Sequence, residues 1–432
     1  MNQAVEAQLR ETIVQAERAA ASGASDEAAR LLAQAERLAP DHPLVLNMAG
    51  ILKLNSGDAS GARRLMERAI ERDAGNPSLW VNLASSHRKL SQPDEEMQAL
   101  ERALAIEPRH LLALLQKASL LEMQGKARAA ASVYKNALQT VPPGVQLPLY
   151  LQGPLQRAAE AVKADTAALE AFLADRLRGV RAQHVNEKQN RFDHCIDTLL
   201  GKRAIFRPQP TFMYFPKLPA WEFYDRDEFP WLDQVEAATA DIRAEFERVF
   251  TEDANRLEPY IAYPDGVPLD QWTELNRSRR WSVFYLWREG RPIDAHLARC
   301  PKTAALLEQV PRVDVPDHGP TAFFSILDAK TRIPAHTGGT NTRLIVHLPL
   351  VVPPGCGFRV GSETREWQPG KAWVFDDTIE HEAWNDSEVP RAVLIFDIWN
   401  PYLTTTERDL VRTATASVRE YYRGHAPVGD AI

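Results

Sequence analysis

The chain has 432 residues, of which 44% are apolar and 25% carry a charge, and its formal net charge is −7. These values are ordinary for a globular protein of two or three domains, and they give no support for a nucleic-acid or anionic-membrane partner. The three cysteines, at 195, 300 and 356, are too far apart in the sequence to indicate a disulfide framework or a zinc site. The N-terminal stretch lacks the apolar core of a signal peptide, and no run approaches the ~20 apolar residues of a membrane span. We therefore expect a cytoplasmic protein without a membrane partner.

Residues 1–142 carry a pattern that recurs every 34 residues. Three sets of positions share this period: the alanines Ala35, Ala69, Ala103 and Ala137, the turn residues Gly23, Gly57, Ser91 and Gly125, and the prolines Pro43 and Pro77. Small alanines suit the crossing of paired helices, and glycine supplies the left-handed conformation that ends a helix. The pattern resembles the tetratricopeptide repeat and predicts an α-helical solenoid. The alternative is a plain helical bundle, which would not require three features on one period.

A solenoid of this kind has a concave face that can hold a peptide or a partner protein. The partner expected here is therefore a peptide or protein substrate held in the groove of the repeats. The competing interpretation is a scaffold or dimerisation element, and the sequence leaves the oligomeric state open.

Residues 143–205 are predicted to form a helical linker. The stretch PPGVQLPLYLQGP (142–154) is rich in proline and glycine and interrupts the array. Helices are expected at 155–180, where apolar residues recur at intervals of three and four, and at 191–202, where Gly201 ends the helix. His194 in the second helix is interpreted as a surface or packing residue.

Residues 206–432 are predicted to form a second domain built on short strands. Alternation indicates strands at 281–287, 321–327, 343–350, 370–377 and 391–399, with helices at 238–250, 302–309 and 406–424. In the first of these strands, Trp281, Val283, Tyr285 and Trp287 are expected on one face. Short alternating strands with histidines at the turns favour a β-barrel or jelly roll with a metal at its mouth.

The alternation also predicts which side chains face a cavity. In RLIVHLPL (343–350), the residues from Leu344 to Leu350 on one face are all apolar, so Arg343, Ile345 and His347 on the other must face a cavity or water. In RAVLIFDIW (391–399), Arg391 shares a face with Asp397. His347 could instead be a satisfied core histidine.

Two histidines at turns are candidates for metal ligands. His336 lies in the turn HTGG, and His381 ends the turn DDTIEH. Two imidazoles can hold Fe(II) and leave coordination positions open for a co-substrate and O2. The carboxylate that usually follows two residues after the first histidine is absent, because that position is Gly338. The alternative is that both histidines are solvated turn residues that bind no metal.

An anion site is expected beside the histidines. Arg391 follows His381 by ten residues, and Ser325 precedes His336 on a predicted strand. A guanidinium fork with a hydroxyl beside it suits a dicarboxylate such as 2-oxoglutarate. The alternative is that Arg391 is a surface charge. Asp376 and Asp377 end the predicted strand 370–377, and either could be mistaken for the missing carboxylate ligand.

These segments together resemble the aspartyl/asparaginyl β-hydroxylase family of Fe(II)/2-oxoglutarate dioxygenases. The matching motifs are HTGGTNTRLIVHL (336–348), FDDTIEHEAWN (375–385), Arg391 and DIWNP (397–401), preceded by WSVFYLWREGR (281–291) and CPKTAALL (300–307). Their order and spacing are kept over residues 210–411. The resemblance implies a double-stranded β-helix (jelly-roll or cupin-like) catalytic domain after the repeats.

The resemblance also implies the site residues and their roles. His336 and His381 would be the iron ligands, with water in place of the third protein ligand. The residues that would bind 2-oxoglutarate are Trp281, Ser325, His347 and Arg391, and Arg391 would also rank with the two histidines as catalytic. Arg343 would bind the substrate. Asp376 and Asp377, which the family match does not use as ligands, would be turn residues that support the site. The implied cofactors are Fe(II), 2-oxoglutarate and O2, and the implied reaction is hydroxylation of the β-carbon of an Asp or Asn residue in a peptide or protein.

The sequence departs from the family at two substrate-side positions. Ile345 stands where the animal members have a second substrate-binding arginine, and Phe323 stands where a lysine assists. The preference for an aspartyl substrate is therefore open. The rival functions are hydroxylation of a free amino acid or other small molecule, acyl-chain hydroxylation, for which a membrane anchor would be expected, and a non-catalytic repeat adaptor with a degenerate barrel.

Overall fold

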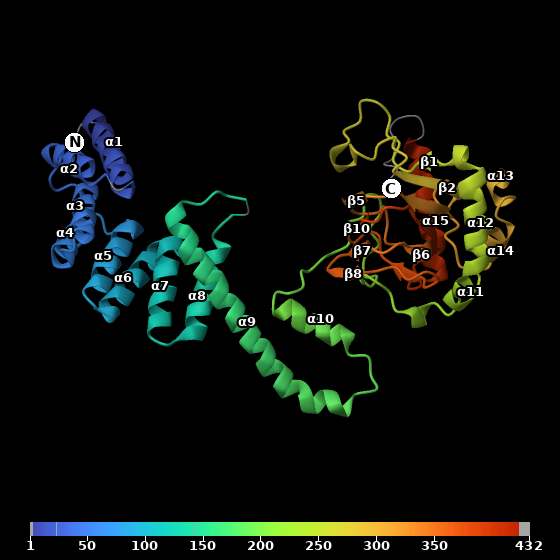
Figure 1. The fold of residues 1–432 in the computed structure, drawn as a ribbon, viewed down its shortest axis with the longest axis horizontal. Coiled ribbons are helices and arrows are strands. Elements are labelled where there is room, and N and C mark those ends of the chain that lie inside the picture. Colours follow the sequence, from blue (N-terminus) through green and yellow to red (C-terminus); the bar gives the residue numbers. More distant parts are fainter. Residues whose placement is uncertain (1–2, 23, 143, 423–432) are drawn as a thin grey trace. The chain divides into compact units, whose positions relative to one another are not determined.

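A computed structural model describes residues 3–22, 24–142 and 144–422 of the chain. The chain forms two compact units, Met1–Lys188 and Gln189–Ile432, which are coloured blue to green and green to red in Figure 1. The boundary between them falls within the segment 143–205 that the sequence predicts as a linker. Among the described residues, no helix combines the length and the apolar character that crossing a bilayer requires.

The first unit is an array of antiparallel helix pairs, which confirms the predicted solenoid. Neighbouring helices pack pairwise in chain order, α1 with α2, α3 with α4, α5 with α6 and α7 with α8. Their bounds are α1 Gln3–Ala21, α2 Ser25–Leu38, α3 Pro43–Asn55, α4 Ala59–Arg72, α5 Pro77–Lys89, α6 Pro93–Ile106, α7 Leu111–Met123 and α8 Ala127–Gln139.

The residues on the 34-residue period occupy the positions that require them. The four alanines are fully buried, so the helices of each pair can approach closely. Gly57 and Gly125 have φ of +93° and +74°, and Ser91 takes the same left-handed conformation at φ +58° although it carries a side chain. Pro43 and Pro77 each open a helix, where the missing N–H has no intrahelical partner to lose. Gly23 lies outside the described residues.

The helix after the array starts earlier than the composition indicates. Helix α9 spans Leu149–Gln183 and contains Pro154, whereas the sequence predicts a start at 155. Pro154 lies near the start of the helix, and Leu151 and Ala158 on either side of it are buried in the core shared with α8. Helix α10 spans Asn190–Leu199 and is followed by Gly201 at φ +72°, as expected.

The second unit contains two antiparallel sheets. The seven-stranded sheet has the order β1-β2-β4-β11-β6-β9, with β3 paired to β2, and the four-stranded sheet has the order β5-β10-β7-β8. The strands of the large sheet are β1 Glu258–Pro259, β2 Trp281–Arg288, β3 Arg291–Pro292, β4 Ala322–Leu327, β6 Arg343–Val351, β9 Trp373–Phe375 and β11 Arg391–Trp399. Those of the small sheet are β5 Thr331–His336, β7 Cys356–Val360, β8 Glu363–Arg365 and β10 His381–Asn385.

From β4 onward the chain passes back and forth between the two sheets. Strands β4, β6, β9 and β11 belong to the large sheet, and β5, β7, β8 and β10 belong to the small one. This alternation is the winding of a double-stranded β-helix, so the predicted fold class is confirmed.

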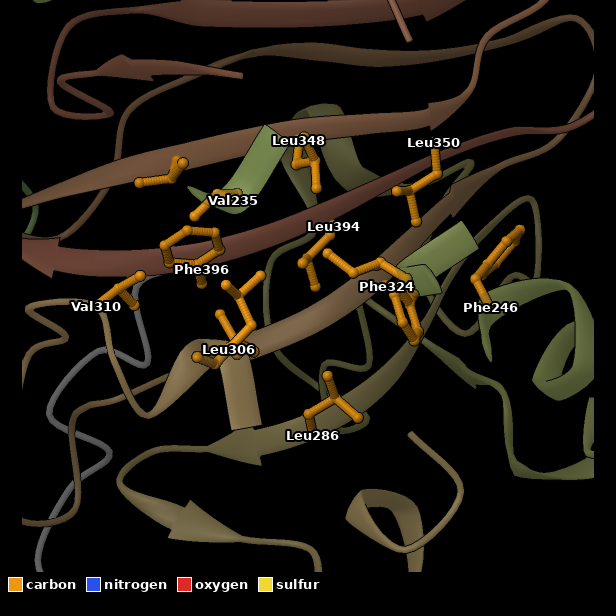
Figure 2. Close-up of a cluster of buried hydrophobic side chains, with 14 of the residues drawn as sticks. Val235, Phe246, Leu286, Leu306, Val310, Phe324, Leu348, Leu350, Leu394 and Phe396 are labelled. Atoms are coloured by element: carbon orange, nitrogen blue, oxygen red, sulfur yellow. The ribbon is translucent and has the colours of Figure 1, made fainter. Parts of the chain in front are cut away.

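Helices cover the outer face of the large sheet. They are α11 Leu232–Ala237, α12 Thr239–Glu252, α13 Asp294–Leu297 and α14 Pro301–Leu307. Figure 2 shows the core beneath them, in which Phe246 of α12 and Leu306 of α14 meet sheet residues such as Phe324. The C-terminal helix α15, Thr405–Tyr422, packs through Val411 near Trp399. The last two residues of the predicted helix 406–424 lie outside the described residues.

The predicted face of Trp287, near the end of β2, is wrong. The pairing of β2 with β4 shifts register after Tyr285, so that Tyr285 faces Phe323 while Trp287 faces Ala322. Because side chains alternate between faces, this shift moves Trp287 into the outer core instead of leaving it on the face of Trp281.

The other strands alternate as predicted, and this directs the polar residues inward. Residues Leu344, Val346, Leu348 and Leu350 of β6 all lie in the outer core. Arg343, Ile345 and His347 consequently face the small sheet, where the candidate site lies.

Candidate active site

A cavity lies in the space between the two sheets. All of the residues that the sequence predicts for the site line it: Trp281, Ser325, His336, Arg343, His347, His381 and Arg391. They come from β2, β4, β5, β6, β10 and β11, so the jelly-roll winding brings together residues that are far apart in the sequence. Ile345 and Phe323, the two positions of departure, line the same cavity.

His336 and His381 form a pair on the small sheet. They are cross-strand partners of β5 and β10, and their ring centroids are 4.1 Å apart. In each ring Nδ1 bonds a backbone carbonyl two residues earlier, Pro334 O at 2.8 Å and Ile379 O at 3.0 Å. Since a carbonyl can only accept, Nδ1 carries the proton and Nε2 keeps its lone pair, which is the tautomer a metal ligand needs.

Burial keeps both imidazoles neutral. It lowers the pKa of His336 to about 4, and it lowers the pKa of His381 well below its usual value, with the neighbouring His336 as a further cause. A neutral imidazole is the form that binds a metal, so the environment favours ligation at neutral pH. Across the described residues, no group of three or more His, Cys, Asp or Glu side chains is arranged to hold a metal ion.

The carboxylate of Asp377, which follows β9, occupies the space beside Gly338 where the usual third ligand would stand. A Cβ on Gly338 would lie 2.1 Å from Asp377 Oδ2, so no larger residue fits there without moving Asp377. The Gly338 N–H also donates to the Asp377 backbone carbonyl at 2.6 Å. Burial raises the pKa of Asp377 to about 7 and its Oδ1 has no hydrogen-bond partner. Asp376 instead accepts from the backbone and hydroxyl of Thr378, as a turn residue does.

Arg391 is a buried cation without a counter-ion. It is 1% exposed, its Nε and Nη1 have no hydrogen-bond partner, and no carboxylate in the described part of the chain forms an ion pair with it. Burial lowers its pKa to about 10, so it stays charged at neutral pH. An unpaired buried charge is costly unless something else neutralises it, which is the signature of an anion site.

The neighbours of Arg391 offer further hydrogen bonds. Ser325 Oγ accepts the indole N–H of Trp281 at 3.1 Å, so the hydroxyl proton is left to be donated. His347 Nδ1 is buried without a partner, and burial beside Arg391 holds the pKa of this histidine well below its usual value. Two neutral imidazoles and a cluster of unsatisfied polar atoms around a cation fit a divalent metal together with a dicarboxylate.

Arg343, the predicted substrate-binding residue, is already paired. Its Nη1 donates to Asp397 Oδ2 at 3.2 Å, and its Nη2 lies 3.7 Å from Asp377 Oδ2. All three groups are buried. Two carboxylates around one guanidinium leave this end of the cavity without a free positive charge.

Mainly apolar side chains lie between Arg343 and Arg391 on the cavity face of the large sheet. Phe323, Ile395 and His347 lie in one cross-strand row, and Ile345 pairs with Asp397 in the next. Tyr260, from the segment after β1, contacts Trp281 in a tilted arrangement with ring centroids 4.2 Å apart and approaches Phe323 at 5.4 Å.

Several lining residues were not predicted from the sequence. They are Tyr260, Trp367, Phe358 and Phe375, which come from loops and from strands of both sheets. Phe375 falls inside a motif that resembles the family, so the motif could have drawn attention to it. Tyr260 and Trp367 lie in irregular segments, where no periodicity indicates a direction for a side chain.

A jelly roll with a buried histidine pair and an unpaired arginine in one cavity defines a cupin-like barrel with a candidate metal centre. A family model described as aspartyl/asparaginyl beta-hydroxylase matches residues 236–401, and tetratricopeptide-repeat models match residues 19–86 and 77–110. The chain is 32% identical to an ornithine lipid ester-linked acyl 2-hydroxylase of Rhizobium tropici over 218 residues, 46% of this chain and 73% of that protein. The chain belongs to the aspartyl/asparaginyl β-hydroxylase family and carries N-terminal tetratricopeptide repeats, as its motifs predicted.

Other relatives share only part of their length with this chain. It is 40% identical to the human aspartyl/asparaginyl beta-hydroxylase over 144 residues, 33% of this chain and 19% of that protein, and the match to the mouse protein has the same extent. It is 29% identical to human aspartate beta-hydroxylase domain-containing protein 2 over 204 residues, 46% of this chain and 53% of that protein. The chain thus covers 19% of the length of the mouse and human β-hydroxylases.

Proposed function

We propose that the chain is an Fe(II)- and 2-oxoglutarate-dependent dioxygenase that hydroxylates the β-carbon of an Asp- or Asn-type residue in a peptide or protein. The observation that carries the proposal is the coexistence, in one cavity, of a neutral histidine pair, in which each Nδ1 donates to a backbone carbonyl, and a buried arginine without a counter-ion. Together they provide for a metal and for a dicarboxylate within the same small volume.

Each residue has a role in this proposal. His336 and His381 would hold Fe(II) through Nε2, with the Nδ1–carbonyl bonds fixing the rings. Arg391 and the Ser325 hydroxyl would bind the outer carboxylate of 2-oxoglutarate, and His347 would support the inner end. When bound, Fe(II) with 2-oxoglutarate and O2 supplies the oxidation, in which one oxygen atom enters the substrate C–H bond and the other enters succinate as CO2 leaves.

The chain itself orients the reactants and excludes water. The aromatic rings of Tyr260, Trp281 and Phe323 form one side of the cavity, and Phe358 and Phe375 form part of the other. Asp377 is not assigned as a metal ligand in this proposal. Its Oδ1 is buried and has no partner, so it would accept a hydrogen bond from a group bound near the metal.

The first test is an anaerobic titration of the Fe(II)-loaded protein with 2-oxoglutarate. Chelation by the keto acid produces a weak visible charge-transfer band, and we expect this band in the wild type and its loss in His381→Ala. Absence of the band in a folded, iron-loaded wild type would contradict the dioxygenase and would favour the non-catalytic repeat adaptor.

The substrate end of the cavity differs in charge from the cofactor end. Arg343 is neutralised by Asp377 and Asp397, and Ile345 and Phe323 add no charge. A substrate carboxylate would therefore meet a guanidinium that is already paired with Asp397 and lies near the partly ionised Asp377. We expect an amide side chain to be accepted better than an acid.

Ile345→Arg is expected to shift the preference toward acidic substrates. The added cation supplies a charge-assisted hydrogen bond worth roughly 1.5–3 kcal/mol, which corresponds to about tenfold or more in the Asp/Asn ratio of kcat/KM. The measurement is 2-oxoglutarate turnover with a matched pair of Asp and Asn peptides, and Ile345→Met controls for the change in size. An unchanged ratio in the arginine variant removes Ile345 from the substrate end.

A second candidate function is hydroxylation of an acyl chain. The wall of Phe323, Ile345 and Ile395 is apolar, and an acyl 2-hydroxylase is among the relatives. Mass spectrometry after turnover separates the two functions, because only the true substrate, the peptide or the acyl amide, gains one oxygen atom. The tetratricopeptide repeats favour the peptide or protein, since arrays of this kind commonly hold such partners.

A further inference from the structure

Arg391 touches one aromatic ring that the proposed function leaves without a role. Its guanidinium carbon lies 4.8 Å from the centroid of Trp367. The guanidinium has no carboxylate partner and two of its nitrogens have no acceptor, so the face of this indole is a group that can stabilise the positive charge.

Trp367 is itself held firmly in place. It lies between β8 and β9 and is 4% exposed. Its ring stacks on Phe358 with centroids 5.4 Å apart at 29°, and on His347 at 6.1 Å and 28°. The ring therefore has little freedom to move and can fix the guanidinium that lies against it.

The indole N–H of Trp367 points to a second role. Trp367 lines the cavity, and its buried Nε1 has no hydrogen-bond partner. By contrast, the Nε1 of Trp281, which lines the same cavity, donates to Ser325. Buried donors are nearly always paired in folded proteins, so an unpaired one on a cavity wall indicates a partner that binds there.

We infer that Trp367 is a positioning residue of the carboxylate subsite: its ring face orients Arg391, and its indole N–H donates to the same bound carboxylate. The inference rests on the proposed function, because it assigns 2-oxoglutarate as the dicarboxylate. It adds a third donor to Arg391 and Ser325, and it explains how a cation without a counter-ion keeps one orientation before the ligand arrives.

The experiment is equilibrium binding of 2-oxoglutarate to the Fe(II)-loaded protein without O2, in the wild type, Trp367→Phe and Trp367→Leu. Phenylalanine keeps an aromatic face and loses the N–H, so we expect the Kd to rise about fivefold to tenfold. Leucine loses both, so we expect a rise of about 30-fold or more. The affinity for Fe(II) alone is expected to stay unchanged in both variants.

Trp373 provides a matched control. It stacks on Trp367 with centroids 5.8 Å apart, and its Nε1 is also buried without a partner, but it does not line the cavity. Trp373→Leu removes the same ring from the same aromatic cluster, so a purely structural role for the cluster predicts equal losses of affinity for Trp373→Leu and Trp367→Leu. We expect the Trp373 variant to stay within about twofold of the wild type.

The outcomes separate the inference from the proposed function. A Trp367→Leu variant with the wild-type Kd, or one no weaker than Trp373→Leu, overturns the role of Trp367 while the dioxygenase stands. If the leucine variant does not fold, the step between wild type and Trp367→Phe decides, and an unchanged Kd in that variant removes the N–H from the subsite. Failure of the wild type to bind 2-oxoglutarate overturns the proposed function, and the role of Trp367 falls with it.

Discussion

Replacing His336 with Ala is expected to abolish iron binding at the site. The metal centre that we propose has only two protein ligands, and the space where a third would stand is taken by the Asp377 carboxylate beside Gly338. Loss of a hydrogen bond to a metal ligand already lowers metal affinity about 10–100-fold, so loss of one of two ligands should exceed the upper end of that range. The measurement is Fe(II) or Mn(II) binding at equilibrium, followed by succinate production.

His296 provides the control for this experiment. Its Nδ1 bonds the backbone carbonyl of Tyr285 at 2.7 Å, as His336 bonds that of Pro334, but it stacks on Phe284 and does not line the cavity. His296→Ala should keep full metal occupancy even if the protein loses stability. Full occupancy in the His336 variant would falsify the assignment of this residue as a ligand.

The parts of the fold that depend on a regular period could be predicted from the sequence. Alanines such as Ala69 fall on the repeat because two helices cross there, and the strand faces of β6 and β11 follow from side chains alternating every residue. The same alternation predicts that the side chains of Arg343, His347 and Arg391 face the cavity. The turns at Gly57 and Gly125 could be predicted for the same reason, because each requires a left-handed conformation.

The parts that depend on contacts between distant segments could not be predicted. Trp287 changes face because β2 slips by one residue against β4, and alternation within β2 gives no sign of this. The neutralisation of Arg343 requires Asp377 and Asp397, which come from a turn and from another strand. Trp367 reaches Arg391 from an irregular loop, where no periodicity applies.

These non-local contacts give the cavity its asymmetry. Arg343 and Arg391 are both buried, but one has two carboxylates near it and the other has none. On the function proposed above, a dicarboxylate co-substrate would bind at the Arg391 end, and the substrate would meet a neutralised and largely apolar surface at the other end. Only the Arg391 end of the cavity presents an unpaired positive charge to an anion.

Arg391→Met is expected to raise the 2-oxoglutarate concentration required for binding by about a hundredfold or more, while the protein keeps or gains stability. The guanidinium has at least two free N–H groups, and each charge-assisted hydrogen bond contributes roughly 1.5–3 kcal/mol to binding. Methionine is unbranched, flexible and uncharged, so it replaces the aliphatic part of the arginine side chain and removes the guanidinium. The measurements are the Kd for 2-oxoglutarate and the thermal unfolding midpoint of the ligand-free protein.

The direction of the stability change is what makes this variant informative. A buried arginine that serves the fold is paired, and removing it leaves a partner unsatisfied, which costs about 3–5 kcal/mol. Arg391 has no such partner, so its removal takes away a desolvation cost that only a bound anion repays. Arg359, which pairs with Glu380 and Glu382 on the small sheet, supplies the comparison, because Arg359→Met should leave 2-oxoglutarate binding unchanged. A large loss of stability in Arg391→Met with unchanged binding would show that the fold, and not the dicarboxylate, requires this charge.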